Sequence, residues 1–234
     1  MIDISVIIPA YNEAARIGPT LTSFHEFLST QAISFELIVV DDGSTDDTVS
    51  LVASMRPTLP HLSVIPLPAN KGKGHAVRTG MLAARGNIRL FSDADGSTPI
   101  TEIDKLLAVL KTGATDIAIG SRYLATSEVT KAQPKIRVVW SRLVNRVMQR
   151  VLLPDIADPH CGFKAFTAAT AQRIFQQCTI DGWSFDLEVL AIAQKLQFRI
   201  QEVPVKWAND ERSKGRLSHL PKELYNVYRI RKRL

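Results

Sequence analysis

Residues 88–96 read IRLFSDADG, a short apolar segment followed at once by two carboxylates. Such a segment predicts a buried strand. Similar segments occur at Ile2 to Ile8, Phe35 to Val40, Leu62 to Leu67 and Asp116 to Ile119. They alternate with stretches long enough for crossover helices, at Glu13 to Ser29, Asp46 to Met55, Gly74 to Arg85 and Thr101 to Lys111. The sequence therefore predicts an α/β fold with a mostly parallel central sheet.

The second half of the chain has a different pattern. After Gly120 come a polar stretch, a helix from about Ile136 to Leu153, shorter mixed elements through Trp207 and a basic helix from Pro221 to Leu234. No repeat or Gly/Ser linker separates the halves. We therefore expect residues 1–234 to form a single domain, with halves of about 1–120 and 121–234 sharing one core.

Composition narrows the classes of protein. The 234 residues are 45% apolar and 22% charged, which excludes a disordered chain. The formal charge of +6 favours an anionic partner: nucleic acid, a phosphorylated small molecule or a lipid surface. Cys161 and Cys178 lack disulfide or zinc spacing, and we see neither a signal peptide nor about 18 uninterrupted apolar residues. These features predict a cytoplasmic protein.

The predicted strands end in polar residues. In open α/β sheets, ligands bind at the carboxyl ends of the strands. The segments expected there are PAYNE at 9–13, DDGS at 41–44, NKGKG at 70–74, DADG at 93–96 and GSR at 120–122. The G-x-G-x-x-G of a dinucleotide site is absent after the first strand, and residues 71–75 lack P-loop spacing.

Asp93 and Asp95 are the candidate metal ligands. Two carboxylates on a turn after a buried strand are costly unless a cation or hydrogen-bond donors compensate them. Mg²⁺ and Mn²⁺ prefer oxygen ligands and commonly bridge carboxylates to phosphates. The alternative is that Asp93 caps the turn while Asp95 faces water. The other polar strand ends favour the metal.

Five ordered motifs resemble those of the family 2 glycosyltransferases. They are VIIPAYNE at 6–13, VVDDGSTD at 39–46, NKGKG at 70–74, DADG at 93–96 and GSRY at 120–123. Later segments resemble the polyprenyl-phosphate sugar transferases: DPHCGFK at 158–164, WSFDLE at 183–188, EVPVKW at 202–207 and SK at 213–214. Within that group, the motifs are more similar to dolichyl-phosphate β-glucosyltransferases than to dolichyl-phosphate mannose synthases.

The resemblance implies a GT-A fold whose first half binds a nucleotide sugar. The implied donor-binding residues are Pro9, Tyr11, Glu13, Asp41, Asp42, Lys73 and Asp93. Tyr11 would pack on the base and Glu13 would lie near the ribose. Successive strand residues face opposite ways, so only one of Asp41 and Asp42 is expected to contact the base. The structural alternatives are core packing for Tyr11, a helix first turn for Glu13 and a solvated turn for Lys73.

The resemblance also assigns the metal and the acceptor phosphate. Asp95, with Asp93, would hold Mg²⁺ or Mn²⁺ against the donor diphosphate. A monophosphate has a second pKa of about 6, so the acceptor is already a nucleophile at neutral pH and needs no base. The cations expected to hold it are Arg122, Lys131, Arg137, Arg142 and Lys214. Asp186 would position the acceptor. His160 and Cys161 lack partners at ligand spacing, so we expect them to serve in packing or hydrogen bonding.

The implied reaction is inverting transfer of glucose from UDP-glucose to a polyprenyl or dolichyl phosphate, catalysed through Asp95, Arg122 and Asp186. Alternatives are a GDP-mannose enzyme, transfer to a glycan hydroxyl with Asp186 as base, and a basic nucleic-acid-binding module, which lacks a supporting motif. We expect no nucleic-acid partner. A lipid-linked acceptor predicts peripheral association with the cytosolic face of a membrane, and the basic tail would favour anionic headgroups.

Overall fold

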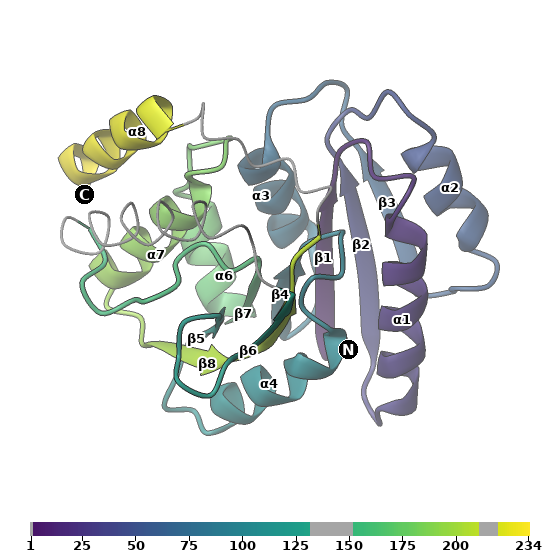
Figure 1. Ribbon diagram of the computed structural model, residues 1–234, viewed down its shortest axis with the longest axis horizontal. Coiled ribbons are helices and arrows are strands. Elements are labelled where there is room, and N and C mark those ends of the chain that lie inside the picture. The colour runs from purple at the N-terminus through teal and green to yellow at the C-terminus, as the bar shows by residue number, and fades with distance from the viewer. Residues whose placement is uncertain (1, 132–151, 211–219) are drawn as a thin grey trace.

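A central sheet lies between two layers of helices in the computed structural model, which describes residues 2–131, 152–210 and 220–234 (Figure 1). The sheet has seven strands in the order β3-β2-β1-β4-β7-β5-β8. Their bounds are β1 Ile4–Ala10, β2 Phe35–Asp41, β3 Leu62–Pro66, β4 Ile88–Ser92, β5 Ile117–Ser121, β7 Phe163–Thr167 and β8 Ile200–Pro204. A second, two-stranded sheet pairs β6 Glu128–Lys131 with β9 Lys206–Ala208.

Alternate residues of the strands face opposite helix layers, as the two-residue period of a strand requires. Ile7 and Phe91 contribute to one apolar core, whereas Val6 and Leu90 contribute to the other. The first core is covered by α3 Lys73–Ala83, α6 Ala168–Phe175 and α7 Phe185–Lys195, with α8 Leu220–Arg233 packed on α7. The second is covered by α1 Ile17–Thr30, α2 Thr48–Met55, the 3-10 turn Ile100–Glu102 and α4 Ile103–Lys111.

Strand β7 is the antiparallel member of the seven-stranded sheet. It lies between β4 and β5, with Lys164 opposite Phe91 of β4 and opposite Ile119 of β5. The other neighbouring strands pair in parallel. Because β7 runs backwards, the turn that precedes it, which contains Gly162, lies at the carboxyl edge of the parallel strands. The second half of the chain thus contributes to the same edge as the first.

The α/β fold with a mostly parallel sheet is confirmed. The predicted strands and helices of the first half are all present, with ends shifted by a few residues; β1, for example, runs to Ala10. The predicted basic helix near the C-terminus is α8. The predicted helix at Ile136 to Leu153 lies almost entirely outside the described residues. Within residues 2–131, 152–210 and 220–234, no helix has both the length and the apolarity needed to cross a bilayer.

Candidate active site at the carboxyl edge of the sheet

Asp93 and Lys73 form an ion pair at the end of β4. Lys73 is the first residue of α3, and its Nζ lies 2.5 Å from Asp93 Oδ1. Burial works to lower the pKa of Lys73, but the charges of Asp93 and Asp186 outweigh it, so the pKa is raised. The same ammonium lies 5.4 Å from the ring centroid of Trp183. Lys73 is therefore a fixed cation directly beside the first carboxylate of the DADG turn.

Gly162 lies directly against the carboxylate of Asp93. A Cβ atom added at Gly162 would lie 2.1 Å from Asp93 Oδ2, closer than any side chain allows. The Gly162 carbonyl also accepts a hydrogen bond of 3.2 Å from the Asp93 amide. The position of this carboxylate thus depends on a glycine contributed by the second half of the chain. Sequence reasoning did not assign Gly162 a role, although it stands in the quoted segment 158–164.

Asp95 is the second carboxylate of the turn. Its Oδ1 accepts a hydrogen bond of 3.0 Å from the Ser97 amide, and its Oδ2 lies 3.9 Å from Arg16 Nη1. Burial, and then the neighbouring charge of Asp93, raise the pKa of Asp95. A bound divalent cation would remove this penalty by stabilising both carboxylates. The oxygen donors of Asp93 and Asp95 therefore fit Mg²⁺ or Mn²⁺, which complete their coordination with phosphate and water.

Glu13 and Arg16 extend the charged cluster. The Arg16 guanidinium donates two hydrogen bonds to the Glu13 carboxylate, and its Nη1 lies 3.2 Å from Asp210 Oδ2. The hydrogen bond with Glu13 is the main reason that the pKa of Arg16 is raised. Arg16 was not predicted as a site residue. Its position three residues after Glu13, at the start of α1, is the signal that could have identified it.

Asp41 and Asp42 support two different loops. The Asp41 carboxylate accepts hydrogen bonds from the amide of Ser44, at 2.9 Å, and from its hydroxyl. Asp42 accepts from the amides of Lys71, at 3.0 Å, and Gly72, at 2.7 Å. The two neighbouring side chains have different partners, with Asp41 at the end of β2 and Asp42 just beyond it. Which of them contacts a base stays a prediction.

Tyr11 follows β1 at the same edge. Its side chain is 36% exposed, so it is not a core residue. The next residue, Asn12, has a φ of 53°, and its Oδ1 accepts a hydrogen bond of 2.8 Å from the Thr45 amide. Pro9 lies within β1, in register with Val40 of β2. The loops after β1 and β2 are thereby tied together, with Tyr11 presented on their surface.

The Gly72–Gly74 loop packs against a segment of the second half. A Cβ at Gly72, whose φ is +119°, would lie 2.4 Å from the Asp181 carbonyl oxygen, and one at Gly74 would lie 2.5 Å from the Ile180 carbonyl oxygen. The His75 amide also donates a hydrogen bond of 3.2 Å to the Asp181 carbonyl. The backbone that approaches these glycines is therefore the 180–181 segment, and Lys73 sits between them.

Arg122 forms a bidentate ion pair with Asp158. Its Nε and Nη2 each donate at 2.7 Å to the Asp158 carboxylate, which also accepts from the Arg122 amide at 2.9 Å. Burial works to raise the pKa of Asp158, but the charge and hydrogen bonds of Arg122 outweigh it and lower that pKa. Asp158 is fully buried. The charge of Arg122 is thus compensated within the protein, and its expected contact with an acceptor phosphate stays a prediction.

Asp186 pairs with Lys164 in the interior. Lys164 is fully buried in β7 and donates hydrogen bonds to Asp186 Oδ1 and, at 2.7 Å, to the Cys161 carbonyl. Asp186 lies in the first turn of α7. The contact with Lys164 fixes the Asp186 carboxylate, and its expected role in positioning the acceptor stays a prediction. Sequence reasoning did not predict Lys164, because nothing in its charge pattern marks it as buried.

Some of the remaining predicted residues are described by the structure, and the others lie outside the described residues. Cys161 is buried, and burial raises the pKa of its thiol to about 12, as suits a packing residue. His160 is partly buried, and burial lowers its pKa. The Lys131 side chain, Arg137, Arg142 and Lys214 lie outside the described residues. Among the described residues, those at or beside the carboxyl edge of the sheet are Tyr11, Glu13, Arg16, Asp41, Asp42, Lys73, Asp93, Asp95, Arg122, Asp158, Gly162, Lys164, Trp183 and Asp186.

Comparison of the sequence with known families and proteins adds two findings. The family described as "Glycosyl transferase family 2" matches residues 5–175. A dolichyl-phosphate beta-glucosyltransferase of Drosophila melanogaster is 37% identical over 225 residues, which cover 91% of this chain and 69% of that protein. The Homo sapiens protein of the same name is 33% identical over 227 residues, which cover 90% of this chain and 69% of the human protein.

Solved structures show the same fold at lower identity. Glucosyl-3-phosphoglycerate synthase from Mycobacterium tuberculosis, in complex with phosphoglyceric acid, superposes with a TM-score of 0.73 at 19% identity, over 98% of this chain and 80% of that chain. The same synthase with Mn²⁺ and uridine-diphosphate-glucose gives a TM-score of 0.69 at 21% identity, over 97% and 76%.

Proposed function

Because the chain belongs to glycosyl transferase family 2, and is a glycosyltransferase, we propose that it transfers glucose from UDP-glucose to a polyprenyl or dolichyl phosphate. We propose this acceptor because the relatives at 33–37% identity are named for dolichyl phosphate. We propose this donor because a solved structure with the same fold holds uridine-diphosphate-glucose. The names of the relatives at 33–37% identity specify glucose and not mannose, which favours UDP-glucose over the GDP-mannose alternative.

The observation that carries the proposal is the Asp93–Lys73 ion pair beside Asp95 at the carboxyl edge of the sheet. This arrangement joins two carboxylates and a buried cation, as a diphosphate bound through a divalent metal requires. Asp93 and Asp95 would hold the Mg²⁺ or Mn²⁺ ion. That ion, when bound, would offset the negative charge that develops on the departing nucleoside diphosphate.

The remaining side chains supply binding and orientation. Tyr11, exposed at the edge, would stack on the base, with Asp41 or Asp42 nearby and Glu13 toward the ribose. We propose that residues 1–120 form this donor half and residues 121–234 the acceptor half. Attack by the acceptor phosphate from the face opposite the nucleotide would invert the anomeric carbon and give a β-linked product.

The role of Asp186 depends on whether the acceptor is a phosphate or a hydroxyl group. Transfer to a glycan hydroxyl requires a group that removes a proton, whereas a phosphate is largely dianionic near neutral pH. Asp186 Oδ1 is paired with Lys164, a contact that fixes the carboxylate in one orientation. We propose that Asp186 positions the acceptor and does not remove a proton. Arg122, together with Arg137, Arg142 and Lys214, stays proposed for holding that acceptor.

The test is a panel of donors and acceptors with purified protein. UDP-glucose, Mn²⁺ and dolichyl phosphate should release UDP and form a lipid-linked glucose, measured by UDP release and by mass spectrometry of the lipid product. Asp95→Asn should lower turnover at least about 100-fold, while Asp104→Asn, at an exposed position on α4, serves as the matched control. No transfer from any nucleotide sugar to any lipid phosphate would refute the proposal. Transfer to a glycan hydroxyl instead would replace its acceptor.

A further inference from the structure

Helix α8 has a buried stripe and an exposed one. Asn226, Val227 and Ile230 are each less than 10% exposed and pack toward α7. The Asn226 side-chain amide donates a hydrogen bond of 3.1 Å to Ser184 Oγ, one residue after Trp183. These contacts settle the rotation of the helix and leave its other side facing solvent.

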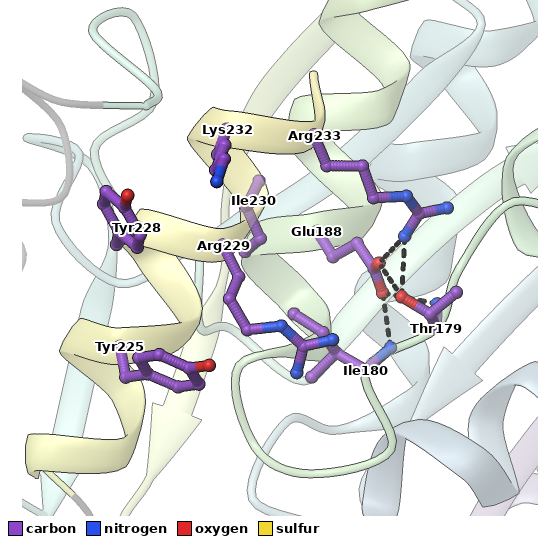
Figure 2. Close-up of a pocket in the computed structure, with 9 residues that line it drawn as sticks. All are labelled: Thr179, Ile180, Glu188, Tyr225, Tyr228, Arg229, Ile230, Lys232 and Arg233. Atoms are coloured by element: carbon purple, nitrogen blue, oxygen red, sulfur yellow. Dashed lines mark hydrogen bonds and ion pairs between the residues drawn. The ribbon is translucent and has the colours of Figure 1, made fainter.

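The exposed stripe combines aromatic and basic side chains. Tyr225 and Tyr228 are 61% and 62% exposed, and Arg229 and Lys232 follow on the same side at helical spacing. The Arg229 guanidinium lies 6.0 Å from the ring centroid of Tyr225, and Figure 2 shows both side chains on one side of α8. We call these four residues the α8 surface.

A hollow of about 320 Å³ lies between the α8 surface and the Thr179–Ile180 segment (Figure 2). The carboxylate that lines it, Glu188, accepts hydrogen bonds from the amides of Thr179 and Ile180 and from Arg233 Nη1, at 2.7 to 2.9 Å. That negative charge is therefore already compensated. The net charge that the hollow offers a ligand comes from Arg229 and Lys232, which makes it complementary to an anion.

The α8 surface is connected to the active-site edge. Glu188 accepts a hydrogen bond from the Ile180 amide, and the adjacent Asp181 carbonyl accepts one from the amide of His75 in the first turn of α3, the helix that begins at Lys73. Asp181 also accepts a hydrogen bond of 2.8 Å from Arg78 of α3. A partner bound at the α8 surface would thus lie against the segment that supports the Lys73–Asp93 pair.

We propose that the α8 surface binds anionic phospholipid headgroups at the surface of a bilayer. Arg229 and Lys232 would contact headgroup phosphates in and beside the hollow, and Tyr225 and Tyr228 would lie at the interface, where amphipathic rings are favoured. The choice of a lipid over a free phosphate rests on the proposed function, because a polyprenyl phosphate acceptor is embedded in a bilayer. Docking through α8 would bring the active-site edge toward that acceptor.

The test is vesicle co-sedimentation without sugar donor or lipid acceptor, so that its failure is distinguishable from failure of the proposed function. Vesicles of phosphatidylcholine, with or without phosphatidylglycerol, are compared at low and physiological salt. The wild-type protein should bind only the vesicles that contain phosphatidylglycerol. Each basic residue near an anionic surface adds about 1 kcal/mol, so the Arg229→Gln, Lys232→Gln double variant should lower the partition coefficient about 30-fold.

The matched control variant also replaces one arginine and one lysine by glutamine, but at positions outside α8. Arg56 directly follows α2 and Lys111 is the last residue of α4. Both helices lie away from α8 in Figure 1, so the Arg56→Gln, Lys111→Gln variant should bind nearly as well as wild type. Equal loss in both double variants, or no binding of the wild-type protein, would overturn the proposal. So would binding to an oligonucleotide that depends on Arg229 and Lys232 in the absence of vesicle binding. Circular dichroism of each variant checks that α8 remains folded.

Discussion

The absence of a side chain at Gly162 determines where the carboxylate of Asp93, a proposed metal ligand, can lie. Gly162 contacts Asp93 so closely that a methyl group would overlap its carboxylate. Since Asp93 is also held by Lys73, it cannot shift without disturbing that ion pair. The geometry of the site is therefore sensitive to the addition of a single methyl group in the turn that precedes β7.

Gly162→Ala should lower kcat about 100-fold, because a displacement of about 1 Å at reacting groups has an effect of this size. The rate is measured at saturating UDP-glucose and Mn²⁺. Gly182→Ala is the control, since a Cβ at Gly182 meets no atom within 4 Å. Equal rates for both variants would show that the position of Asp93 is unimportant for transfer.

Asp158→Asn should destabilise the fold by about 3 to 5 kcal/mol, because it leaves the largely buried Arg122 guanidinium, whose side chain is 17% exposed, without its counter-charge. The pKa of Asp158 is lowered in the folded protein, so its stabilising contribution is present above the unfolded pKa, near 3.8. That contribution is lost as the pH falls below about 4 toward the folded pKa. Urea unfolding at neutral and acid pH measures both effects.

In the variant, stability should fall less steeply below pH 4 than in the wild-type protein. Asp155→Asn, at an exposed position on the same loop, should leave the free energy of unfolding within about 0.5 kcal/mol of wild type. A variant as stable as wild type at neutral pH would contradict a structural role for the pair.

At the scale of elements, one buried ion pair joins β7 to α7. Lys164 reaches Asp186 from the middle of the sheet, and neither side chain is appreciably exposed to water. A buried pair of this kind is costly to break from one side only, because the remaining charge has no partner. The packing of α7 on the sheet therefore depends on both residues being present.

Lys164→Met should destabilise the protein by about 3 to 5 kcal/mol, and adding Asp186→Leu should restore at least part of that loss. Urea unfolding of the two single variants and the double variant gives the coupling energy. The double variant should still show reduced transfer, since Asp186 is proposed to position the acceptor. If the double variant folds and transfers sugar normally, that positioning role is wrong.

At the scale of the whole molecule, the site is assembled by the sheet. Asp93 and Asp95 are held by Lys73, Gly162 and the Ser97 amide, all within the protein. We therefore expect EDTA to lower transfer at least about 100-fold while changing the melting temperature by less than about 2 °C. Activity and thermal unfolding are measured on the same sample, and Mn²⁺ should restore the rate. A large fall in melting temperature would instead assign the metal a structural role.

The sequence predicted those parts of the fold that depend on local pattern. Strands such as β4 and the carboxylates after them follow from short apolar segments ending in polar residues. The insertion of β7 between β4 and β5 could not be predicted in this way. Phe91 and Lys164 are far apart in the chain, and no local pattern encodes their pairing. The same limit applies to the site: Asp95 was predicted from its motif, whereas Gly162 and Lys164 acquire their roles only through contacts.

The antiparallel strand β7 also determines when the molecule can fold during synthesis. β4 is complete at Ser92 and β5 at Ser121, but the strand that lies between them begins only at Phe163. Until the ribosome has released that segment, β4 and β5 each have an unpaired edge with no neighbour to hydrogen-bond. We therefore expect the nascent chain to pass through a stage in which the edges that β7 later pairs are open, and unpaired strand edges favour aggregation.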